Sequence, residues 1–558
     1  MRERSSLSLR DKPDGLARLD CWPSQPVTFA PAAAGSASCS VAAIRPGWCD
    51  MSAVLVSDGR RRGRFRRAPR LLVIVAVLGL AAASCGGHPA PSASSPPVNS
   101  LTVKACTVDG LPARCGTLIV AQDRLTGQGL TIPIRFVVFP ATGPDRAPDP
   151  VVWFEGGPGS SAIDSISVTL PLLGSLNVHR DVVYIDQRGT GGSNPLSCPP
   201  FPGLADKSAL RASVQSCLAH LHGDLRFYTS AMIADDISQV LTALHYTTAN
   251  LAGTSYGPTL EQVFLLRHPG QVRTMTLISG TLLNTSVYEQ QPGDTQLALN
   301  YVLALCQRQP SCHQAFPHLA ADWASLWASV GRAPWTVPAA QSPTGHTLTL
   351  DQGTLEYQVS QLLYTGNIGP IPVLIHTLSA AKDKAAVLIS IAKLTGGSQA
   401  ASGGNVSGIF YSIRCDEPWE SDRPAALADQ RTSFAYQTLL QDAEQMQYIC
   451  PLIPKSAAAV GHEQLTVSTV PVLTFNGDAD PSDQPRNMAG AQKFWPDSLE
   501  LALPGQGHEP TTGAWAVCAG PLMQAFIEQA SVAHLDTSCL ATSPTPPFDP
   551  TLQAAAGG

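Results

Sequence analysis

The chain has few aromatic and few charged residues, and each shortage excludes a class of protein. Of its 558 residues, 6% are aromatic and 14% are charged, whereas 44% are hydrophobic. This hydrophobic fraction is too high for a largely disordered chain. The composition is also too mixed for a protein that crosses a membrane several times. A globular protein is therefore predicted.

The sequence also lacks the spacings that bind metals. It contains no Cys-x-x-Cys and no His-x-x-x-His pair, so no metal centre is predicted, and no cofactor is expected. Basic residues are scarce after residue 84, where 23 of them stand against 36 acidic residues, a net charge of −13. Because such a surface repels phosphate backbones, a nucleic-acid partner is not expected.

The first 84 residues differ from the rest and resemble a leader. Seven arginines lie between Arg60 and Arg70, and an apolar run at 71–83 follows. As a helix this run is only ~20 Å long, which is shorter than the ~30 Å hydrocarbon core of a membrane. A basic segment before a short apolar run is typical of a signal peptide, so one is predicted over residues 51–84.

The end of the apolar run predicts where the leader is processed. Ala82-Ala83-Ser84-Cys85 resembles a bacterial lipobox, which implies cleavage before Cys85 and a lipid on its sulfur. The protein would then be exported and anchored to the outer face of the bacterial cell membrane; secretion with loss of Cys85 is the alternative. Met51 lies at an ordinary distance before the apolar run, so translation is expected to start there and residues 1–50 are excluded from the fold.

Ten cysteines follow Cys85, and an even number in an exported chain predicts disulfide bonds. Pairing of nearest neighbours is expected, because each pair then stays within one structural segment, although the spacing leaves other pairings open. The predicted order of segments is a leader at 1–84, a Pro/Ser-rich flexible tether at 85–100, a core at 101–284, a cap at 285–465, a second part of the core at 466–545 and a tail at 546–558.

Short apolar runs predict strands that are buried on both faces. Such runs lie at 131–139, 151–154, 181–185, 249–252, 274–278, 470–475 and 499–503. Helical patterns such as 231–244 and 259–267 separate several of them, and this alternation is typical of a doubly wound, mostly parallel α/β sheet. The alternation stops after Ile278 and resumes at Val470. The stretch between them is rich in helical patterns, which predicts a mostly helical cap inserted into the sheet.

Two glycine-rich segments predict the centre of a hydrolytic site. Gly253-Thr-Ser255-Tyr-Gly257 has the Gly-x-Ser-x-Gly form of a nucleophile elbow, between an apolar strand and a helical run. Glu155-Gly-Gly157-Pro-Gly159 also follows a strand, and its glycines let the backbone approach a substrate closely. We expect the amides of Gly157 and Tyr256 to form an oxyanion hole. A plain structural turn is the alternative for either segment.

A third segment, Asp186-Gln-Arg188-Gly-Thr-Gly-Gly-Ser193, completes a family resemblance. The order of the three segments is similar to that of prolyl and tripeptidyl aminopeptidases, which are serine aminopeptidases of the α/β-hydrolase family. The resemblance covers roughly residues 101–540. It implies the α/β-hydrolase fold with a cap, and a catalytic Ser, Asp and His in that chain order. In this family the third segment is mainly architectural, so Asp186 and Arg188 are expected to form a structural ion pair.

The acid and the base are expected in loops after the last strands. Gly477-Asp478-Ala-Asp480-Pro-Ser-Asp483 directly follows a strand, as a catalytic loop at the carboxyl edge of a sheet does. Asp480 fits the family's Gly-x-x-Asp pattern, so Asp478 and Asp483 are expected to form turns. His508 follows Gly505-Gln-Gly507 and is the predicted base. Only His534 also lies beyond Asp480, and it falls in a predicted terminal helix.

Substrate specificity is expected to reside in the cap. Family aminopeptidases hold the free amino terminus of the substrate with carboxylates, and Cys415-Asp416-Glu417 is similar to their acidic, cysteine-containing segment. Asp416 and Glu417 are therefore candidate ammonium anchors; exposed cap charges are the alternative. Glu155 stands where prolyl aminopeptidases carry His, and a carboxylate there can itself attract an amine.

These features predict an exported serine hydrolase. The leading hypothesis is an aminopeptidase that releases short N-terminal units, from one amino acid to a tripeptide, through an acyl-enzyme. A carboxylesterase or lipase of the same fold is the alternative, because a serine triad acts on amides and esters through the same intermediate. A surface lipoprotein that binds without catalysis is the second alternative. The expected partners are a peptide or ester substrate and, through the lipid anchor, the membrane.

Overall fold

The computed structural model describes residues 97–394, 406–418, 423–456, 464–510 and 513–548. The predicted leader, Cys85 and most of the expected tether lie outside these residues. The last tether residues are described: the Asn99 N–H donates to the Ile119 carbonyl at 2.7 Å, so this end of the tether is bonded to the sheet. Within the described ranges, no helix is both long enough and apolar enough to cross a membrane.

A nine-stranded sheet forms the centre of the fold, in the order β1-β2-β3-β5-β4-β7-β8-β12-β13. The first three strands and the β3–β5 pair are antiparallel, and all later neighbours are parallel. The strands are β1 (Leu101–Val108), β2 (Leu111–Ala121), β3 (Thr131–Phe139), β4 (Val151–Phe154), β5 (Val182–Ile185), β7 (Ala249–Thr254), β8 (Val272–Ile278), β12 (Val472–Gly477) and β13 (Ser498–Leu503).

The central strands are apolar because helices cover both faces of the sheet. Every residue of β4, β5 and β12 is buried, which is why these strands appear in the sequence as continuous apolar runs. One face packs against α4 (Ser230–Ala243) and α5 (Tyr256–Arg267), and α3 (Lys207–His220) joins the same hydrophobic core at a greater distance from the strands. The other packs against α1 (Ile166–Thr169), α2 (Leu176–His179) and α14 (Gly520–Gln529). The doubly wound α/β sheet is thereby confirmed.

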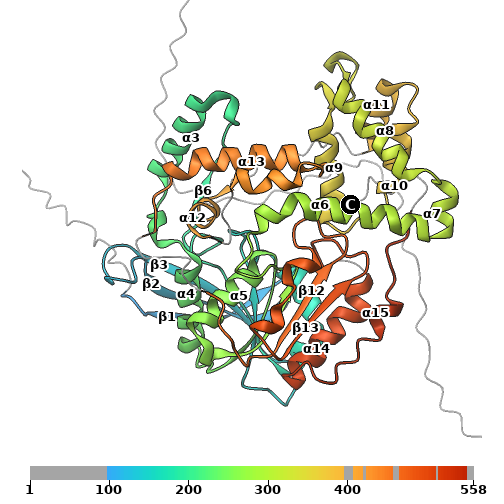
Figure 1. Cartoon of the computed structure of the whole chain (residues 1–558). Helices are drawn as coiled ribbons and strands as arrows, with labels where there is room; N and C mark the ends of the chain where they lie inside the picture. Colours follow the sequence, from blue (N-terminus) through green and yellow to red (C-terminus); the bar gives the residue numbers. More distant parts are fainter. Residues whose placement is uncertain (1–96, 395–405, 419–422, 457–463, 511–512, 549–558) are drawn as a thin grey trace, which may run out of the picture. The chain divides into compact units, whose positions relative to one another are not determined.

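The chain between β8 and β12 is mostly helical and lies beyond one end of the strands (Figure 1). It contains α6 (Val287–Arg308), α7 (Pro310–Ala315), α8 (Leu319–Arg332), α9 (Gln352–Tyr364), α10 (Ile371–Ser379), α11 (Lys384–Leu394), α12 (Gly408–Asp416) and α13 (Tyr436–Ile449). Short strands accompany them: β9 (Trp335–Val337) pairs with β10 (Leu348–Leu350), and β11 (Val406–Ser407) pairs with β6 (Ser197–Cys198) of the core. We call this whole stretch the insertion.

The insertion has two parts that are packed differently. Helices α6 to α11 share a hydrophobic core of their own, in which Trp323 and Trp327 stack at 5.5 Å between ring centroids. Helices α12 and α13 instead contribute Ile409, Ile413 and Met446 to the core that lies against the sheet. The second part is therefore continuous with the domain that contains the sheet, whereas the first is a separately packed unit.

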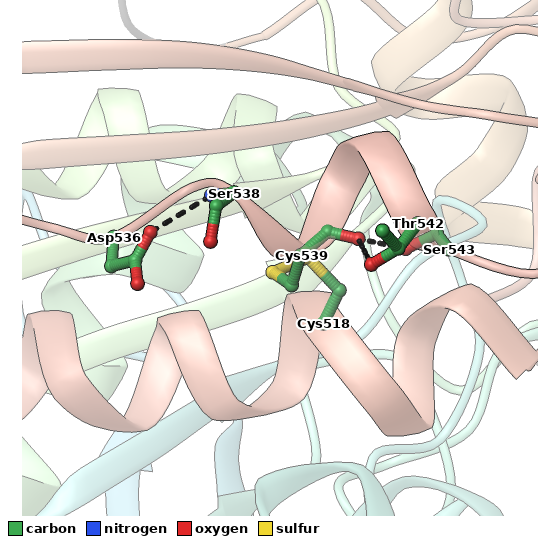
Figure 2. The surroundings of a disulfide bond; sticks show 6 residues. All are labelled: Cys518, Asp536, Ser538, Cys539, Thr542 and Ser543. Atoms are coloured by element: carbon green, nitrogen blue, oxygen red, sulfur yellow. Dashed lines mark hydrogen bonds between the residues drawn. A yellow bond between two sulfur atoms is a disulfide. The ribbon is translucent and has the colours of Figure 1, made fainter. Parts of the chain in front are cut away.

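Five disulfides pair the cysteines in the expected nearest-neighbour order. They are Cys106–Cys115, Cys198–Cys217, Cys306–Cys312, Cys415–Cys450 and Cys518–Cys539. Figure 2 shows the last of them, which joins the π-helical turn before α14 to the start of α15 (Cys539–Thr542). The Cys539 carbonyl there accepts the hydroxyls of Thr542 at 3.2 Å and Ser543 at 3.0 Å, so the bridge secures the C-terminal segment against the core.

The expected ion pair between Asp186 and Arg188 is wrong. Arg188 is fully buried and binds Asp236 of α4, with its Nε 2.6 Å from the carboxylate. Asp186 instead accepts the Gly192 N–H at 2.8 Å and the Ser161 hydroxyl at 2.7 Å. The two side chains have separate structural tasks, because Asp186 closes the turn that follows β5 while Arg188 ties this turn to α4.

Candidate active site

Ser255 occupies a strained turn between β7 and α5. Its backbone has φ 61° and ψ −119°, a conformation that a residue with a side chain adopts only where the surroundings hold it. The turn also brings α5 against β4: a Cβ on Gly257 would lie 2.2 Å from the Phe154 carbonyl oxygen. Only glycine fits at that position, which explains the second glycine of the motif and gives the geometry of a nucleophile elbow.

His508 and Asp480 meet at the carboxyl edge of the sheet. Nδ1 of His508 lies 3.0 Å from both carboxylate oxygens of Asp480, and both residues are buried. Asp480 is held in turn by the backbone N–H groups of Ser482 at 2.8 Å and Asp483 at 2.9 Å. The structure therefore brings the predicted acid and base into direct contact, and the acid itself forms the turn.

A second carboxylate also faces His508. Oδ2 of Asp483 lies 3.5 Å from Nδ1, and its other oxygen accepts the Thr281 hydroxyl at 2.5 Å. Asp483 takes part in the turn as expected, since its backbone N–H donates to Asp480. In addition, its side chain faces His508 and the loop that follows β8, which the sequence did not predict. The signal was present in the sequence as three aspartates in one loop, but spacing did not reveal which of them would face the ring.

The two carboxylates set the protonation of this cluster. Burial acts to raise the pKa of Asp480, but the charge and hydrogen bond of His508 outweigh it and hold the pKa below its usual value. Burial raises the pKa of Asp483 to about 7, against the opposing charge of His508. For His508, burial acts to lower the pKa, but Asp480 and Asp483 outweigh it and raise the pKa to about 9. The imidazolium form is therefore stabilised at this site.

Ser255 and His508 line the same two cavities. One, which we call the Thr281 cavity, has walls rich in hydroxyl groups; it is lined by Gly157, Ser255, Tyr256, Thr259, Thr281, Leu282, Leu283, Thr285, Val287, Tyr288, Gln291, Tyr364, Ser482, Asp483 and His508. The other, the Trp153 cavity, is lined by Trp153, Glu155, Gly156, Gly157, Ser160, Ser165, Val168, Thr169, Leu172, Thr254, Ser255, Tyr364, His508, Glu509 and Pro510. Ser255 therefore borders a cavity on each of two sides.

The contact between nucleophile and base is looser than the contact between base and acid. Among the described residues, no hydrogen bond joins the Ser255 hydroxyl to the His508 ring. Catalytic hydrogen bonds of this kind are often long without substrate and shorten in the substrate complex. The structure brings the three predicted residues to one place, with the Asp480–His508 bond already formed.

The predicted oxyanion residues flank Ser255. A Cβ on Gly156 would lie 2.9 Å from the Ser255 Cβ, so the glycine turn after β4 passes directly beside the nucleophile. Gly157, with φ +118°, lines both cavities, and Tyr256 is the first residue of α5 and lines the Thr281 cavity. The two segments that contain the predicted donors therefore border the space in which a tetrahedral intermediate would form.

Tyr364 of the insertion completes the site, and no motif in the sequence pointed to it. It is the last residue of α9, and its carbonyl accepts the backbone N–H groups of His508 at 2.8 Å and Glu509 at 3.0 Å. Its ring lies 4.4 Å from the His508 ring, tilted by 31°. Burial raises the pKa of Tyr364 well above its usual range, an effect that interaction with the Ser255 hydroxyl partly opposes.

The structure does not bring two of the three predicted ammonium anchors to the cavities. Asp416 accepts the Ser456 N–H at 2.8 Å and lies 3.5 Å from Nζ of Lys455. Glu417 is fully buried and binds Ser230. Neither residue lines the Thr281 cavity or the Trp153 cavity. The acidic segment lies next to α12, which packs against the sheet, and its carboxylates are used there for structural bonds.

The third predicted anchor, Glu155, does line the Trp153 cavity. Its carboxylate accepts Trp153 Nε1 at 2.9 Å, the Gly156 N–H at 3.0 Å and the Ser165 hydroxyl. These three donors already use most of its acceptor capacity. Glu155 thus stabilises the glycine turn and also presents negative charge to one side of the site.

One group in the described part of the chain brings potential metal ligands together. Asp480, Asp483 and His508 offer ligand atoms that lie within 4.8 Å of one another. The ring nitrogen that faces the carboxylates is the one bonded to Asp480 at 3.0 Å. A cation there would replace the proton that this bond requires, so the geometry fits an acid–base pair better than a metal centre.

Sheet order, elbow and loop positions together define the α/β-hydrolase fold. Residues 149–325 match the family model described as the alpha/beta hydrolase fold. The matched range begins just before β4 and includes Ser255, but it ends before Asp480 and His508. The fold assignment made from the sequence is confirmed.

Curated relatives are similar over part of the chain. Carboxylesterase B of Mycobacterium tuberculosis is 27% identical over 224 residues, which are 36% of this chain and 43% of that protein. A hydrolase of Mycobacterium bovis matches to the same extent. The chain therefore spans less than half the length of the curated relatives it matches.

Solved structures with a similar arrangement include hydrolases of different names. An esterase from Thermogutta terrifontis is 13% identical, with a TM-score of 0.32, and the match covers 75% of this chain and 99% of the esterase. A proline iminopeptidase from Mycobacterium smegmatis is 14% identical, with a TM-score of 0.32, over 75% of this chain and 99% of that one.

Proposed function

We propose that this protein is a serine hydrolase in which Ser255, His508 and Asp480 act as nucleophile, base and acid. One observation carries the proposal: a serine on a strained elbow shares both of its cavities with a buried histidine whose Nδ1 lies 3.0 Å from the Asp480 carboxylate. This arrangement of exposed nucleophile, oriented base and buried acid is the one that acyl transfer requires.

The reaction would proceed through an acyl-enzyme. Neutral His508 takes the proton from Ser255 as the serine oxygen attacks the substrate carbonyl, and Asp480 stabilises the imidazolium that forms. His508 then gives this proton to the leaving group. Water, activated by His508 in the same way, attacks the acyl-serine and releases the acid product. Every step uses side chains of this chain.

The developing negative charge would be stabilised by two backbone amides. We propose the N–H groups of Gly157 and Tyr256, which belong to the segments on either side of Ser255. Hydrogen-bond donors that are fixed before the reaction stabilise the oxyanion strongly, and losing one such donor typically costs ~3 kcal/mol of barrier.

The finer proposal is an aminopeptidase that releases short N-terminal units from peptides. The resemblance of the three glycine-rich segments to prolyl and tripeptidyl aminopeptidases supports it. The charge of the site supports it as well: Asp483 lines the Thr281 cavity and Glu155 and Glu509 line the Trp153 cavity. Neither cavity has a lysine or an arginine among its described lining residues, so the surroundings of Ser255 favour a positively charged substrate group.

A carboxylesterase is the second candidate. The observation that favours it is the partial similarity to carboxylesterase B, which is named for ester hydrolysis. Both candidates use the same triad, and they differ in whether the substrate must carry a free amine.

The test uses purified protein and matched substrates. Peptide anilides with free and with acetylated amino termini, and p-nitrophenyl esters of the same acyl groups, separate the two candidates. Preference for the free amine supports the aminopeptidase, and cleavage of blocked esters without cleavage of free-amino peptides rejects it. Labelling of Ser255 by a fluorophosphonate, with Ser255→Ala as the control, tests the hydrolase proposal itself; absence of labelling in the folded protein would overturn it.

We also propose that the protein is exported and held at the outer face of the cell membrane through Cys85. The five disulfides support export, because such bonds persist in oxidising compartments. Mass spectrometry of the protein from membranes checks the anchor: Cys85→Ala should abolish the lipid and release the protein, and an unlipidated Cys85 in native protein would contradict it.

A further inference from the structure

A buried chain of hydrogen bonds leads from the insertion to the nucleophile elbow. Glu417, just after α12, is fully buried and accepts both the backbone N–H of Ser230 at 2.7 Å and its hydroxyl at 2.5 Å. The Ser230 hydroxyl lies 2.6 Å from the phenol oxygen of Tyr256. Because the Ser230 proton goes to the carboxylate, the phenol donates to Ser230 in turn. We call Glu417, Ser230 and Tyr256 the Glu417 relay.

Two members of the relay, Ser230 and Tyr256, are each the first residue of a helix. Ser230 is the first residue of α4, so the Glu417 carboxylate sits at a helix N-terminus, where negative charge is favourable. Tyr256 directly follows Ser255 and is the first residue of α5. Ser230 is fully buried and Tyr256 is 3% exposed. Charged hydrogen bonds that are shielded from water in this way hold their partners more firmly than exposed ones.

The elbow needs such support. The positive φ of Ser255 is a strained conformation, of the kind that costs ~1–3 kcal/mol and persists only where neighbouring structure opposes relaxation. Relaxation would rotate the peptide between Ser255 and Tyr256, and with it the Tyr256 N–H. The ring of Tyr256 cannot follow this rotation while its hydroxyl is bonded to Ser230.

We infer that Glu417 is a positioning residue, which acts through Ser230 and the Tyr256 hydroxyl to hold the elbow and the Tyr256 amide in their reactive orientation. The inference rests on the proposed hydrolase function. It gives the buried carboxylate of the acidic segment a task other than binding a substrate amine, and it makes the part of the insertion around α12 a support of the oxyanion site.

The experiment compares three small changes along the relay with one matched change outside it. Ser230→Ala and Tyr256→Phe each remove a hydrogen bond of the relay, and Glu417→Gln removes its charge and replaces one acceptor oxygen with an NH2 donor; all three change the volume little. Ser412→Ala is the control, because the buried Ser412 hydroxyl of α12 bonds the Leu225 carbonyl at 2.9 Å and takes no part in the relay. Hydrolysis of a p-nitrophenyl ester, with its amine free and with its amine blocked, reports kcat and KM, and thermal unfolding reports stability.

Each relay variant is expected to lower kcat ~10-fold or more with KM changed less than twofold, because the amide acts in the transition state. The double variant Glu417→Gln/Tyr256→Phe should lose no more kcat than the more damaging of the two single variants, since both break the same chain. Ser412→Ala should lower the unfolding temperature to a similar degree while keeping kcat.

Three results would overturn the inference. They are an unchanged kcat in Glu417→Gln, a KM that rises only for free-amino substrates, and an equal loss of kcat in Ser412→Ala. Tyr256→Phe keeps the test decisive if Glu417→Gln does not fold, because it removes only one oxygen atom. Failure of the proposed function looks different: wild-type hydrolysis would then be unaffected by Ser255→Ala.

Discussion

The loops at the carboxyl edge of the sheet and the insertion both reach the site, but they contribute in different ways. The loops carry the three residues of the proposed triad, Ser255, Asp480 and His508. The insertion supplies contacts to these groups: Tyr364 binds the backbone of the histidine loop, and Glu417 reaches Tyr256 through Ser230. The difference teaches that reactive groups can be encoded by short segments, whereas their positioning depends on packing between distant parts of the chain.

The two parts of the insertion repeat this contrast on a smaller scale. Helices α6 to α11 have their own core and meet the site through Tyr364 at the end of α9. Helices α12 and α13 share the core of the sheet, and the residue next to α12 is bonded to the first residue of α4. Helices α6 to α11 therefore contact His508 through the end of α9. The residue after α12 instead bonds α4, whose first residue contacts Tyr256.

The largest effect is expected from the loops. Ser255→Ala and Asp480→Asn should each lower kcat on an ester substrate ~1000-fold or more, because they remove the nucleophile or the group that orients its base. The unfolding temperature of Ser255→Ala should stay close to that of the wild type. If either variant kept a tenth of the wild-type kcat, the assignment of the reactive groups to the loops would be contradicted.

The second prediction separates the two carboxylates that face His508. Only neutral His508 accepts the serine proton, and its pKa is raised to about 9, so kcat/KM should rise with pH up to that value. Asp483→Asn removes a negative charge that raises this pKa. The rising limb should therefore move to lower pH, by about one unit, and activity at pH 7 should increase several-fold.

A pH profile of kcat/KM between pH 5 and 10 measures this shift. Thr281→Val is a graded comparison: it removes the hydroxyl whose hydrogen bond lowers the pKa of Asp483, so Asp483 is charged less often and the rising limb should move in the same direction but less far. A limb that moves to higher pH in Asp483→Asn would contradict the electrostatic role assigned to this side chain.

A smaller effect is expected from Tyr364. Tyr364→Ala removes the ring that lies 4.4 Å from His508 and should lower kcat/KM ~10-fold, since the imidazole loses a packing surface. Tyr364→Phe keeps the ring and removes the hydroxyl near Ser255, so it should lose less, about twofold to threefold. Steady-state kinetics on one ester decides the order, and a greater loss in the Phe variant would assign the main role to the hydroxyl.

The smallest effect on activity is expected from the disulfides. Cys415–Cys450 closes 35 residues next to Glu417, and Cys106–Cys115 closes nine residues at the edge of the sheet. Loop entropy predicts losses of unfolding free energy of ~4 and ~2.5 kcal/mol when each pair is replaced by serine. Activity at 25 °C should fall about twofold in the first variant only. If the two disulfide variants were equally active, the Glu417 relay would not need the Cys415–Cys450 bond.

The sequence was sufficient for the sheet and for the reactive groups, for a physical reason. Strands buried on both faces are continuous apolar runs, and parallel topology places the loops that follow them at one edge. Ser255 and Asp480 each follow such a strand, and His508 follows β13, which pairs in parallel with β12, so their meeting could be predicted without knowledge of the insertion. The geometry of Ser255 also follows from its flanking glycines, since Gly257 must pass close to β4.

The contacts of the insertion could not be predicted in this way. Tyr364 ends an ordinary amphipathic helix, and nothing in the residues around it distinguishes it from a core tyrosine. Glu417 was expected to face a substrate because its segment resembles the acidic, cysteine-containing segment of family aminopeptidases, with an exposed cap charge as the alternative. It is buried instead, because its direction depends on how α12 packs against α4. Asp483 lies three residues from Asp480, and only the fold of that turn decides which carboxylate takes the bond to the ring.

The backbone bonds from the Tyr364 carbonyl join the end of α9 to the histidine loop. A Cβ on Gly507 would lie 2.1 Å from the Leu363 carbonyl oxygen, so the two segments are in close backbone contact. A movement of α9 away from the sheet would break both bonds and displace His508. Any movement of the insertion that leaves His508 in place must therefore occur elsewhere than at the end of α9.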